Sequence, residues 1–372
     1  MITIRLTRNT FMRNKVSILK YLLLLEALLF LSCTGNTQQF DKKVISENAD
    51  KTVICFVYHR FGDSRYPSTN VSVSDFELHI QWLKKHKYQI LSLSEAIQYL
   101  ESDDAVRKVA VITIDDGYKS FIKNGLPVLK KYKASATLYI NTGTVGGGDY
   151  MDWSELKTVV NNNIEIGNHT HSHSYFLNEL ASTRYSSFKD EIELSQSIIQ
   201  KHLNFTPVTF SYPYGEFDAK MEDIVKQLGF KSACAQNSGV IYSGSDVFKC
   251  PRFPMSEAYS SLDKFVEKAS AKPLVIAKIS PENSQLPSDR KPILTLTLNN
   301  KDLQLDQLQC FVQGGKCSIN RKDKTDTQTT ISFQSATPFG KRRRTLYTIT
   351  VPDKNGIWHW YSHLWVDASI RE

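Results

Sequence analysis

The pattern of hydrophobic positions indicates alternating strands and helices over the first two thirds of the chain. Val53–Tyr58 is a continuous apolar run, which is typical of a strand buried on both faces. Ser74-Asp75-Phe76-Glu77 has the form of a capping box, and apolar residues follow it at helical spacing. Further strands, separated by helical patterns, are predicted at Gln89–Leu93, Val109–Ile114, Ala136–Ile140, Ile164–Ile166, Val208–Phe210 and Lys231–Ala235. Repeated β-then-α units imply parallel strands, so we expect an α/β fold, a distorted (β/α) barrel of the TIM type, over residues 51–272.

Beyond residue 272 the period of the pattern changes to two. Turn residues, and no helical patterns, separate four alternating segments at Ile293–Leu298, Thr329–Phe333, Thr345–Val351 and Ile357–Val366. This predicts a small β-sandwich domain over residues 273–372.

Two features of this tail allow more than one interpretation. Aromatic residues of segment 358–365 fall on both faces of the last predicted strand, with Trp360 on one face and Trp365 on the other. They can form a core face and a cover against the barrel, or a platform on which sugars stack. The basic run Lys341–Arg344 can be a solvated turn, or it can hold an acidic glycan or lipid headgroups.

The first 32 residues have the regions of a secretory signal peptide. Basic residues precede an apolar run, Tyr21–Leu31, that is too short to span a bilayer. Cys33 follows directly and resembles the lipid-bearing cysteine of a bacterial lipoprotein. We therefore expect export to the bacterial cell envelope, on the periplasmic or outer-membrane face, a membrane anchor on Cys33, and a polar linker over residues 33–50.

Composition and charge exclude several classes of protein. With 372 residues, of which 41% are hydrophobic, the chain is not disordered, collagen-like or a dense disulfide scaffold. The net charge of +8 is unevenly distributed, since residues 33–272 carry 27 basic and 28 acidic side chains. We therefore expect no nucleic-acid partner.

Export allows disulfides, and the spacing of the cysteines offers two candidate pairs. Cys310 and Cys317 bracket a Gly-Gly turn, and Cys234 and Cys250 flank two strand-like runs. Cys55 lies inside an apolar strand, where we expect a small buried hydrophobe.

Polar clusters stand at the ends of the predicted strands. They are Tyr58–Arg60, Asp115–Gly117, Gly167–His173, Ser211–Gly215 and Pro251–Pro254. Because the carboxyl ends of barrel strands meet at one mouth, we expect these clusters to form a single functional site.

Asp116, His169 and His173 form a candidate metal site. Histidines at i and i+4 can share one face, and three protein ligands leave an open position for water, as catalytic zinc requires. A bound divalent ion polarises a carbonyl and activates water. Asp115 would be a carboxylate beside that water, placed to act as general base. The pattern predicts metal-assisted hydrolysis of an acyl bond, with Zn²⁺ expected for a His₂Asp set and Co²⁺, Ni²⁺ or Fe²⁺ as alternatives.

Three segments resemble the sequence motifs of the polysaccharide deacetylases, carbohydrate esterase family 4. Thr113–Tyr118 is similar to the first motif, His169–His173 to the second and Phe210–Gly215 to the third, over roughly residues 51–260. The details look most like the branch that acts on poly-N-acetylglucosamine. The resemblance implies a distorted barrel, removal of acetyl groups from glycans, Asp115 as base and a metal held by the three residues named above.

The resemblance also suggests roles for three further residues. The backbone N–H of Tyr214 would bind the oxyanion. Many members carry an arginine in the third motif that holds the catalytic aspartate; Ser211-Tyr212 stands there in this chain, and Arg252 is the candidate substitute. No copy of the family's Leu-x-His motif precedes residue 272, so His59 is the candidate general acid or substrate contact, with a structural hydrogen bond as the alternative.

Three functions are compatible with these patterns. The first is an enzyme that removes N-acetyl groups from an acetylated polysaccharide outside the cytoplasm. The second is a glycan-binding lipoprotein with an inactive barrel, and the third is an O-acetyl esterase. Retention of Asp115 together with all three metal ligands favours an enzyme, because a binding protein needs no base.

Overall fold

The computed structural model describes residues 51–371. The predicted signal peptide, Cys33 and the predicted linker lie outside these residues. None of the helices in the described part of the chain has the length and apolar character that a membrane span requires.

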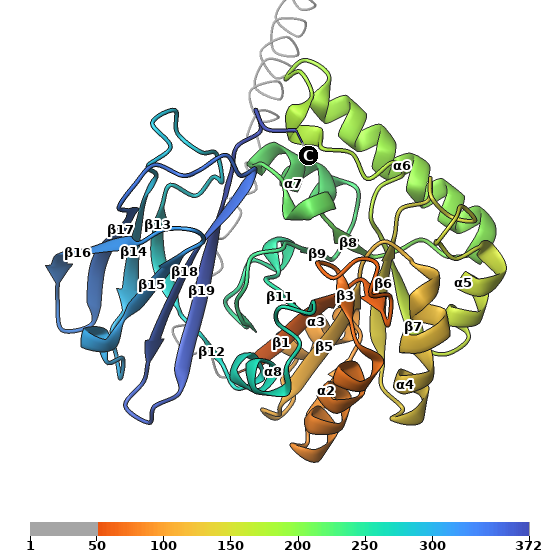
Figure 1. The fold of residues 1–372 in the computed structure, drawn as a ribbon, viewed down its shortest axis with the longest axis horizontal. Helices are drawn as coiled ribbons and strands as arrows, with labels where there is room; N and C mark the ends of the chain where they lie inside the picture. The colour runs from red at the N-terminus through yellow and green to blue at the C-terminus, as the bar shows by residue number, and fades with distance from the viewer. Residues whose placement is uncertain (1–50, 372) are drawn as a thin grey trace, which may run out of the picture. The chain divides into compact units, whose positions relative to one another are not determined.

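The first part of the structure is a curled nine-stranded sheet (Figure 1). Its strands are β1 (Thr52–Tyr58), β4 (Gln89–Leu91), β5 (Val109–Ile114), β6 (Ala136–Ile140), β7 (Ile164–Asn168), β8 (Thr209–Ser211), β9 (Ser232–Cys234), β10 (Ile241–Tyr242) and β11 (Phe253–Pro254). The main path runs β10-β1-β5-β6-β7-β8-β9, while β11 pairs with β1 and β4 with β5. The pairs β1–β5, β5–β6, β6–β7, β7–β8 and β8–β9 are all parallel, as the predicted β-then-α units require.

Helices connect these strands, and Figure 1 shows α4, α5 and α6 around the outer side of the sheet. The helices are α2 (Val73–Lys85), α3 (Leu93–Glu101), α4 (Leu126–Lys131), α5 (Trp153–Val160), α6 (Arg184–Leu203), α7 (Ala219–Gln227) and α8 (Leu262–Ala269). Short helical turns lie at η1 (Phe121–Gly125), η2 (Phe176–Asn178), η3 (Pro213–Gly215) and η4 (Val247–Lys249), with η5 (Leu305–Gln307) later in the chain.

The sheet is distorted where two strands, β4 and β6, pair with the same side of β5. One edge of β5 pairs with β1 along its length, and the other is divided between β4, at residues 109–111, and β6, at residues 113–114. Cys234 of β9 forms a parallel bridge with Cys250, and β11, three residues on, pairs with β1. This curled, partly closed sheet is consistent with the predicted distorted (β/α) barrel.

Helix caps explain two of the predicted element boundaries that are wrong. The strand predicted over Gln89–Leu93 ends at Leu91, because Ser92 and Glu95 form a capping box that begins α3. The box predicted at Ser74 lies inside α2, whose N-cap is Ser72, with Oγ accepting the backbone N–H of Asp75 at 3.0 Å.

The C-terminal part consists of two four-stranded sheets (Figure 1). One has the order β12 (Lys272–Pro273), β19 (Trp358–Val366), β18 (Arg344–Pro352), β15 (Gln309–Val312); the other has the order β13 (Ile276–Ser280), β14 (Ile293–Asn299), β17 (Gln328–Ser335), β16 (Cys317–Lys324). Alternate residues of both sheets, such as Leu296, Phe333 and Ile349, belong to one buried hydrophobic cluster. Two sheets that share a core in this way are what we expect of a β-sandwich.

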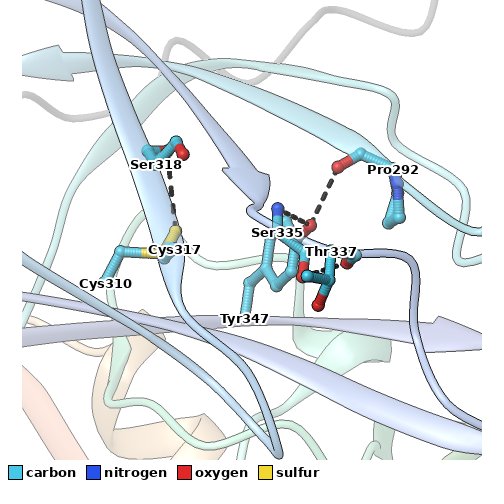
Figure 2. The surroundings of a disulfide bond; sticks show 7 residues. All are labelled: Pro292, Cys310, Cys317, Ser318, Ser335, Thr337 and Tyr347. Atoms are coloured by element: carbon cyan, nitrogen blue, oxygen red, sulfur yellow. Dashed lines mark hydrogen bonds between the residues drawn. A yellow bond between two sulfur atoms is a disulfide. The ribbon is translucent and has the colours of Figure 1, made fainter.

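Cys310 of β15 and Cys317 of β16 form a disulfide with a Cα–Cα distance of 5.8 Å, which confirms this predicted pair (Figure 2). The other candidate pair is wrong. Cys234 and Cys250 are free and buried, although their backbones are bridged. The Cys250 thiol faces the Val247 carbonyl oxygen at 3.1 Å instead. Cys55 is fully buried, as predicted.

The aromatic residues of β19 divide between two cores. Trp360 packs against the core of the curled sheet, where its ring lies 5.4 Å from that of Phe253. Tyr361 and Trp365 join the cluster shared by the two C-terminal sheets. The predicted division of this strand into two faces is confirmed, and these side chains serve packing.

Candidate catalytic and metal site

The candidate residues stand on neighbouring strands of the curled sheet. Asp115 and Asp116 follow β5, His169 follows β7, and Ser211 ends β8. The backbone of Asp115 bonds to the Tyr58 carbonyl oxygen at the end of β1, at 2.9 Å. The parallel sheet therefore brings together residues that lie far apart in the sequence, at the carboxyl ends of its strands.

Asp115 and Arg252 form a buried bidentate ion pair. Arg252 donates from Nη1 to Asp115 Oδ1 at 2.8 Å and from Nη2 to Oδ2 at 2.9 Å, and neither side chain is exposed. Ser211 Oγ lies 3.4 Å from Oδ2 and accepts a hydrogen bond from Arg252 at 3.1 Å. A further bond, from Arg252 Nε to the Ala235 carbonyl oxygen at 2.9 Å, fixes the orientation of the guanidinium.

This pairing determines the charge of Asp115. Burial alone would raise the pKa of the Asp115 carboxyl, but the charge of Arg252, followed by that of His169, outweighs it and holds the pKa well below its usual range. Asp115 is therefore an ionised carboxylate with no exposed surface.

Asp116, His169 and His173 bring three ligand atoms to one point. Asp116 Oδ1 lies 3.7 Å from His169 Nε2 and 3.6 Å from His173 Nε2, and the two nitrogens are 3.0 Å apart. Donors about 2.1 Å from a tetrahedrally bound Zn²⁺ are separated by roughly 3.4 Å, so the spacing fits such an ion. Within residues 51–371, this is the cluster of acidic, histidine and cysteine side chains that could hold a metal.

The surroundings prepare both imidazoles for this role. His169 Nδ1 donates to the Ser211 carbonyl oxygen at 2.7 Å, which leaves Nε2 as a free acceptor. Burial, and then the neighbouring charge of His169, lower the pKa of His173 to about 4, so its ring is neutral at pH 7. Neutral imidazoles are the form that binds metal ions.

Left-handed backbone conformations are concentrated at this site. Asp116 has φ 74°, Thr170 66°, His173 56° and Tyr214 59°. Non-glycine residues adopt such angles at a cost of about 1–3 kcal/mol each, and they persist where the surroundings hold them. At Asp116 the turn directs the side chain to the histidines, while the preceding Asp115 points to Arg252.

Comparison with known proteins agrees with this geometry. Residues 102–233 match the family model described as polysaccharide deacetylase. By this match, residues 102–233 are similar to a polysaccharide deacetylase domain. A poly-β-1,6-N-acetyl-D-glucosamine N-deacetylase of Staphylococcus aureus is 27% identical over 212 residues, which are 54% of this chain and 73% of that protein.

Two solved structures share the fold of the deacetylase domain. The deacetylase PplD of Streptococcus pyogenes has a TM-score of 0.54 at 21% identity and covers 59% of this chain and 98% of its own. IcaB from Ammonifex degensii has a TM-score of 0.51 at 22% identity and covers 59% of this chain and 96% of its own.

The deacetylase domain also holds the other predicted residues near this site. His59 is half-buried directly after β1, and it is one of the groups that influence the pKa values of Asp115 and His173. The Tyr214 ring lies 4.4 Å from that of His173, in an edge-to-face arrangement.

The sequence interpretation assigned no role to several residues around this site. Ser211 Oγ and Thr113 Oγ1 both contact the Arg252 guanidinium, the latter at 3.2 Å. Tyr175 stacks on Tyr214 with ring centroids 3.7 Å apart. Thr113 and Ser211 stand within motif segments and Tyr175 lies two residues beyond one, so their position was an available signal.

Proposed function

We propose that this protein removes N-acetyl groups from a poly-N-acetylglucosamine-type polysaccharide by metal-assisted hydrolysis. The observation that carries the proposal is the ionised, buried Asp115 beside the Asp116, His169 and His173 cluster. The name of the Staphylococcus aureus relative supports the choice of substrate. With the predicted export signal, the reaction would take place in the cell envelope, and a lipid on Cys33 would keep the enzyme at the membrane.

Asp116, His169 and His173 would hold a divalent ion, with Zn²⁺ expected for a His₂Asp set. When bound, the ion supplies positive charge to the acetyl carbonyl and makes a water molecule more acidic.

The chain's own residues supply the remaining steps. Asp115 takes the proton of the attacking water at a carboxylate oxygen, while Arg252 keeps that carboxylate ionised and oriented. The backbone N–H of Tyr214 donates to the oxyanion that develops on the acetyl oxygen. His59 donates a proton to the leaving nitrogen, the C–N bond breaks, and acetate and a glucosamine unit are released.

Acetate release from N-acetylglucosamine oligomers tests the proposal. Wild-type protein should release acetate, lose the activity in chelator and recover it on addition of Zn²⁺ or Co²⁺. Asp115→Asn should lower the rate by at least about 10²-fold, since general base catalysis contributes about 10²–10⁴-fold. The matched control is Asp104→Asn, which alters an exposed carboxylate paired with Arg107 and should leave the rate unchanged.

The outcomes separate the alternatives. Protein that binds metal and glycan but releases no acetate would show a glycan-binding protein instead of an enzyme. Activity on O-acetylated xylan oligomers in the absence of activity on N-acetylated ones would show an O-acetyl esterase. Activity that survives both chelator and Asp115→Asn would refute the mechanism.

A further inference from the structure

Two arginines at the start of β18, Arg343 and Arg344, reach the third motif of the deacetylase domain. Arg343 donates from Nε to Glu216 Oε1 at 2.6 Å and from Nη2 to Oε2 at 2.5 Å, and Arg344 donates from Nη1 to Oε1 at 2.9 Å. Arg343 is 1% exposed and Glu216 4%. Glu216 directly follows η3, so this buried ion pair connects the backbone of the motif to the beginning of β18.

A series of ring contacts extends from these arginines to the metal ligands. The Arg343 guanidinium carbon lies 4.4 Å from the ring centroid of Tyr175, a distance at which cation–π attraction operates. Tyr175 and Tyr214 stack at 3.7 Å with an angle of 8°, and Tyr214 contacts His173. Arg344 lies 5.3 Å from the Tyr214 ring.

The backbone of this segment needs such support. Tyr214 has φ 59° and Gly215 φ 70°, two consecutive left-handed residues. A Cβ at residue 215 would lie 2.7 Å from the backbone nitrogen of Gln236, so a tight neighbour fixes one side of the turn. Glu216, held by two guanidinium groups, fixes the other side. Strained conformations of this kind persist only where the surroundings over-determine them.

The guanidinium of Arg343 makes its hydrogen bonds and its ion pair with groups inside the protein. Besides Glu216, its Nη1 donates to Asn178 Oδ1 at 2.7 Å and to the carbonyl oxygen of Ile370. The sequence allowed the basic run to be a solvated turn or a binding site for acidic groups, and for Arg343 both interpretations are wrong. Lys341 and Arg342, its neighbours in the run, are exposed.

We propose that Arg343, supported by Arg344, is a positioning residue for the deacetylase site. It acts through Glu216 and Tyr175 to hold Tyr214, so the C-terminal domain completes an active site that lies in the other domain. This inference rests on the proposed function for its effect on the rate, but the effect on the segment 212–217 can be measured without any reaction.

The test compares four variants with the wild type. Arg343→Gln removes the guanidinium that binds both Glu216 oxygens, and Arg343→Lys keeps the charge. Arg343→Gln with Glu216→Gln removes both buried charges, so that the variant folds without a buried carboxylate that has lost one of its two partners. Arg342→Gln is the matched control. Hydrogen exchange of peptides covering 212–217 is followed by mass spectrometry, with peptides from β14 as the internal reference. Acetate release gives kcat and KM, and Co²⁺ titration gives the metal Kd.

We expect Arg343→Gln and the double variant to exchange at least about tenfold faster in 212–217, with no change in β14. Their kcat should fall at least about tenfold, compared with the ~10²–10³-fold that loss of an oxyanion donor costs. KM and the Co²⁺ Kd should stay within about threefold of wild type, Arg343→Lys should recover part of kcat, and Arg342→Gln should match the wild type.

Unchanged exchange over 212–217 in both Arg343→Gln and the double variant would overturn the positioning role, whatever the rates are. Faster exchange with an unchanged kcat would overturn its catalytic importance. If the wild type releases no acetate from any oligomer, the proposed function fails, and faster exchange over 212–217 still supports the positioning role.

Discussion

Replacing Arg252 by methionine should destabilise the protein by removing the partner of a buried charge. The Asp115 carboxylate would lose hydrogen bonds of 2.8 and 2.9 Å and keep the longer one from Ser211 Oγ, at 3.4 Å. Asp115 has no exposed surface, so bulk solvent does not directly compensate for the lost partner.

The size of the effect follows from the burial of both groups. Removing one partner of a buried ion pair costs about 3–5 kcal/mol. The entropy of unfolding is about 2.1 cal/mol/K per residue, so residues 51–371 contribute roughly 0.7 kcal/mol/K. We therefore expect Arg252→Met to lower Tm by about 4–7 °C.

A double-mutant cycle isolates the ion pair from other effects of the substitution. Asp115→Asn alone leaves the guanidinium unpaired, whereas Asp115→Asn combined with Arg252→Met leaves no buried charge. The double variant should therefore be more stable than the sum of the single effects predicts, by at least about 2 kcal/mol. Thermal unfolding followed by circular dichroism, in chelator so that no metal contributes, measures each corner of the cycle.

The exposed pair of Asp104 and Arg107, 3.1 Å apart with side chains 54% and 38% exposed, is the matched control. Its cycle should give a coupling energy below about 0.5 kcal/mol. If Asp115 and Arg252 show a coupling as small as this control, the reasoning about the buried pair is wrong.

Three further predictions concern separate parts of the molecule. His173→Ala should weaken Co²⁺ binding by at least about 10²-fold, because it removes one of three ligands, and an unchanged Kd in a Co²⁺ titration would contradict the metal site. Burial lowers the pKa of His79 to about 4, so the folded protein keeps this ring neutral. The unfolded chain takes up the proton first, and the free energy of unfolding should therefore fall by roughly 2–3 kcal/mol between about pH 6.5 and 4. Urea unfolding at several pH values should show a smaller fall for His79→Gln. Replacing Cys310 and Cys317 by serine should destabilise the C-terminal sheets by up to about 2.5 kcal/mol, because the disulfide closes only a short loop. If the folded variant loses acetate release, the disulfide is not purely structural.

The strand pattern made much of the fold predictable. Val109–Ile114 and Ala136–Ile140 were predicted with the bounds that the structure shows, because each strand is buried on both faces and leaves an unbroken apolar run. Parallel strands then bring their carboxyl ends together, which is why the residues that follow β5, β7 and β8 could be grouped from their positions in the sequence. Boundaries set by a competing cap, as at Ser92, could not be read from hydrophobicity alone.

The contacts between the two parts of the chain could not be predicted in this way. Arg343 and Glu216 are 127 positions apart, and a run of four basic residues gives no sign that its third member is buried. The left-handed backbone conformation of Asp116 could not be predicted either, since it depends on tertiary contacts. The misassigned Cys234–Cys250 pair illustrates the same limit: the backbones are adjacent, but the thiols have other neighbours.

Asp115 and Asp116 are joined by a single peptide bond, whereas the two histidines are presented from beyond a different strand. Relative movement of the strands would change the distances from Asp116 to His169 and His173, whereas Asp115 and Asp116 both follow β5 and would move together. If Asp116 holds an ion together with the two histidines, as proposed, we expect warming to weaken the binding of that ion before it separates Asp116 from Asp115. A heated sample that has lost activity should then regain it on cooling with added metal, without refolding.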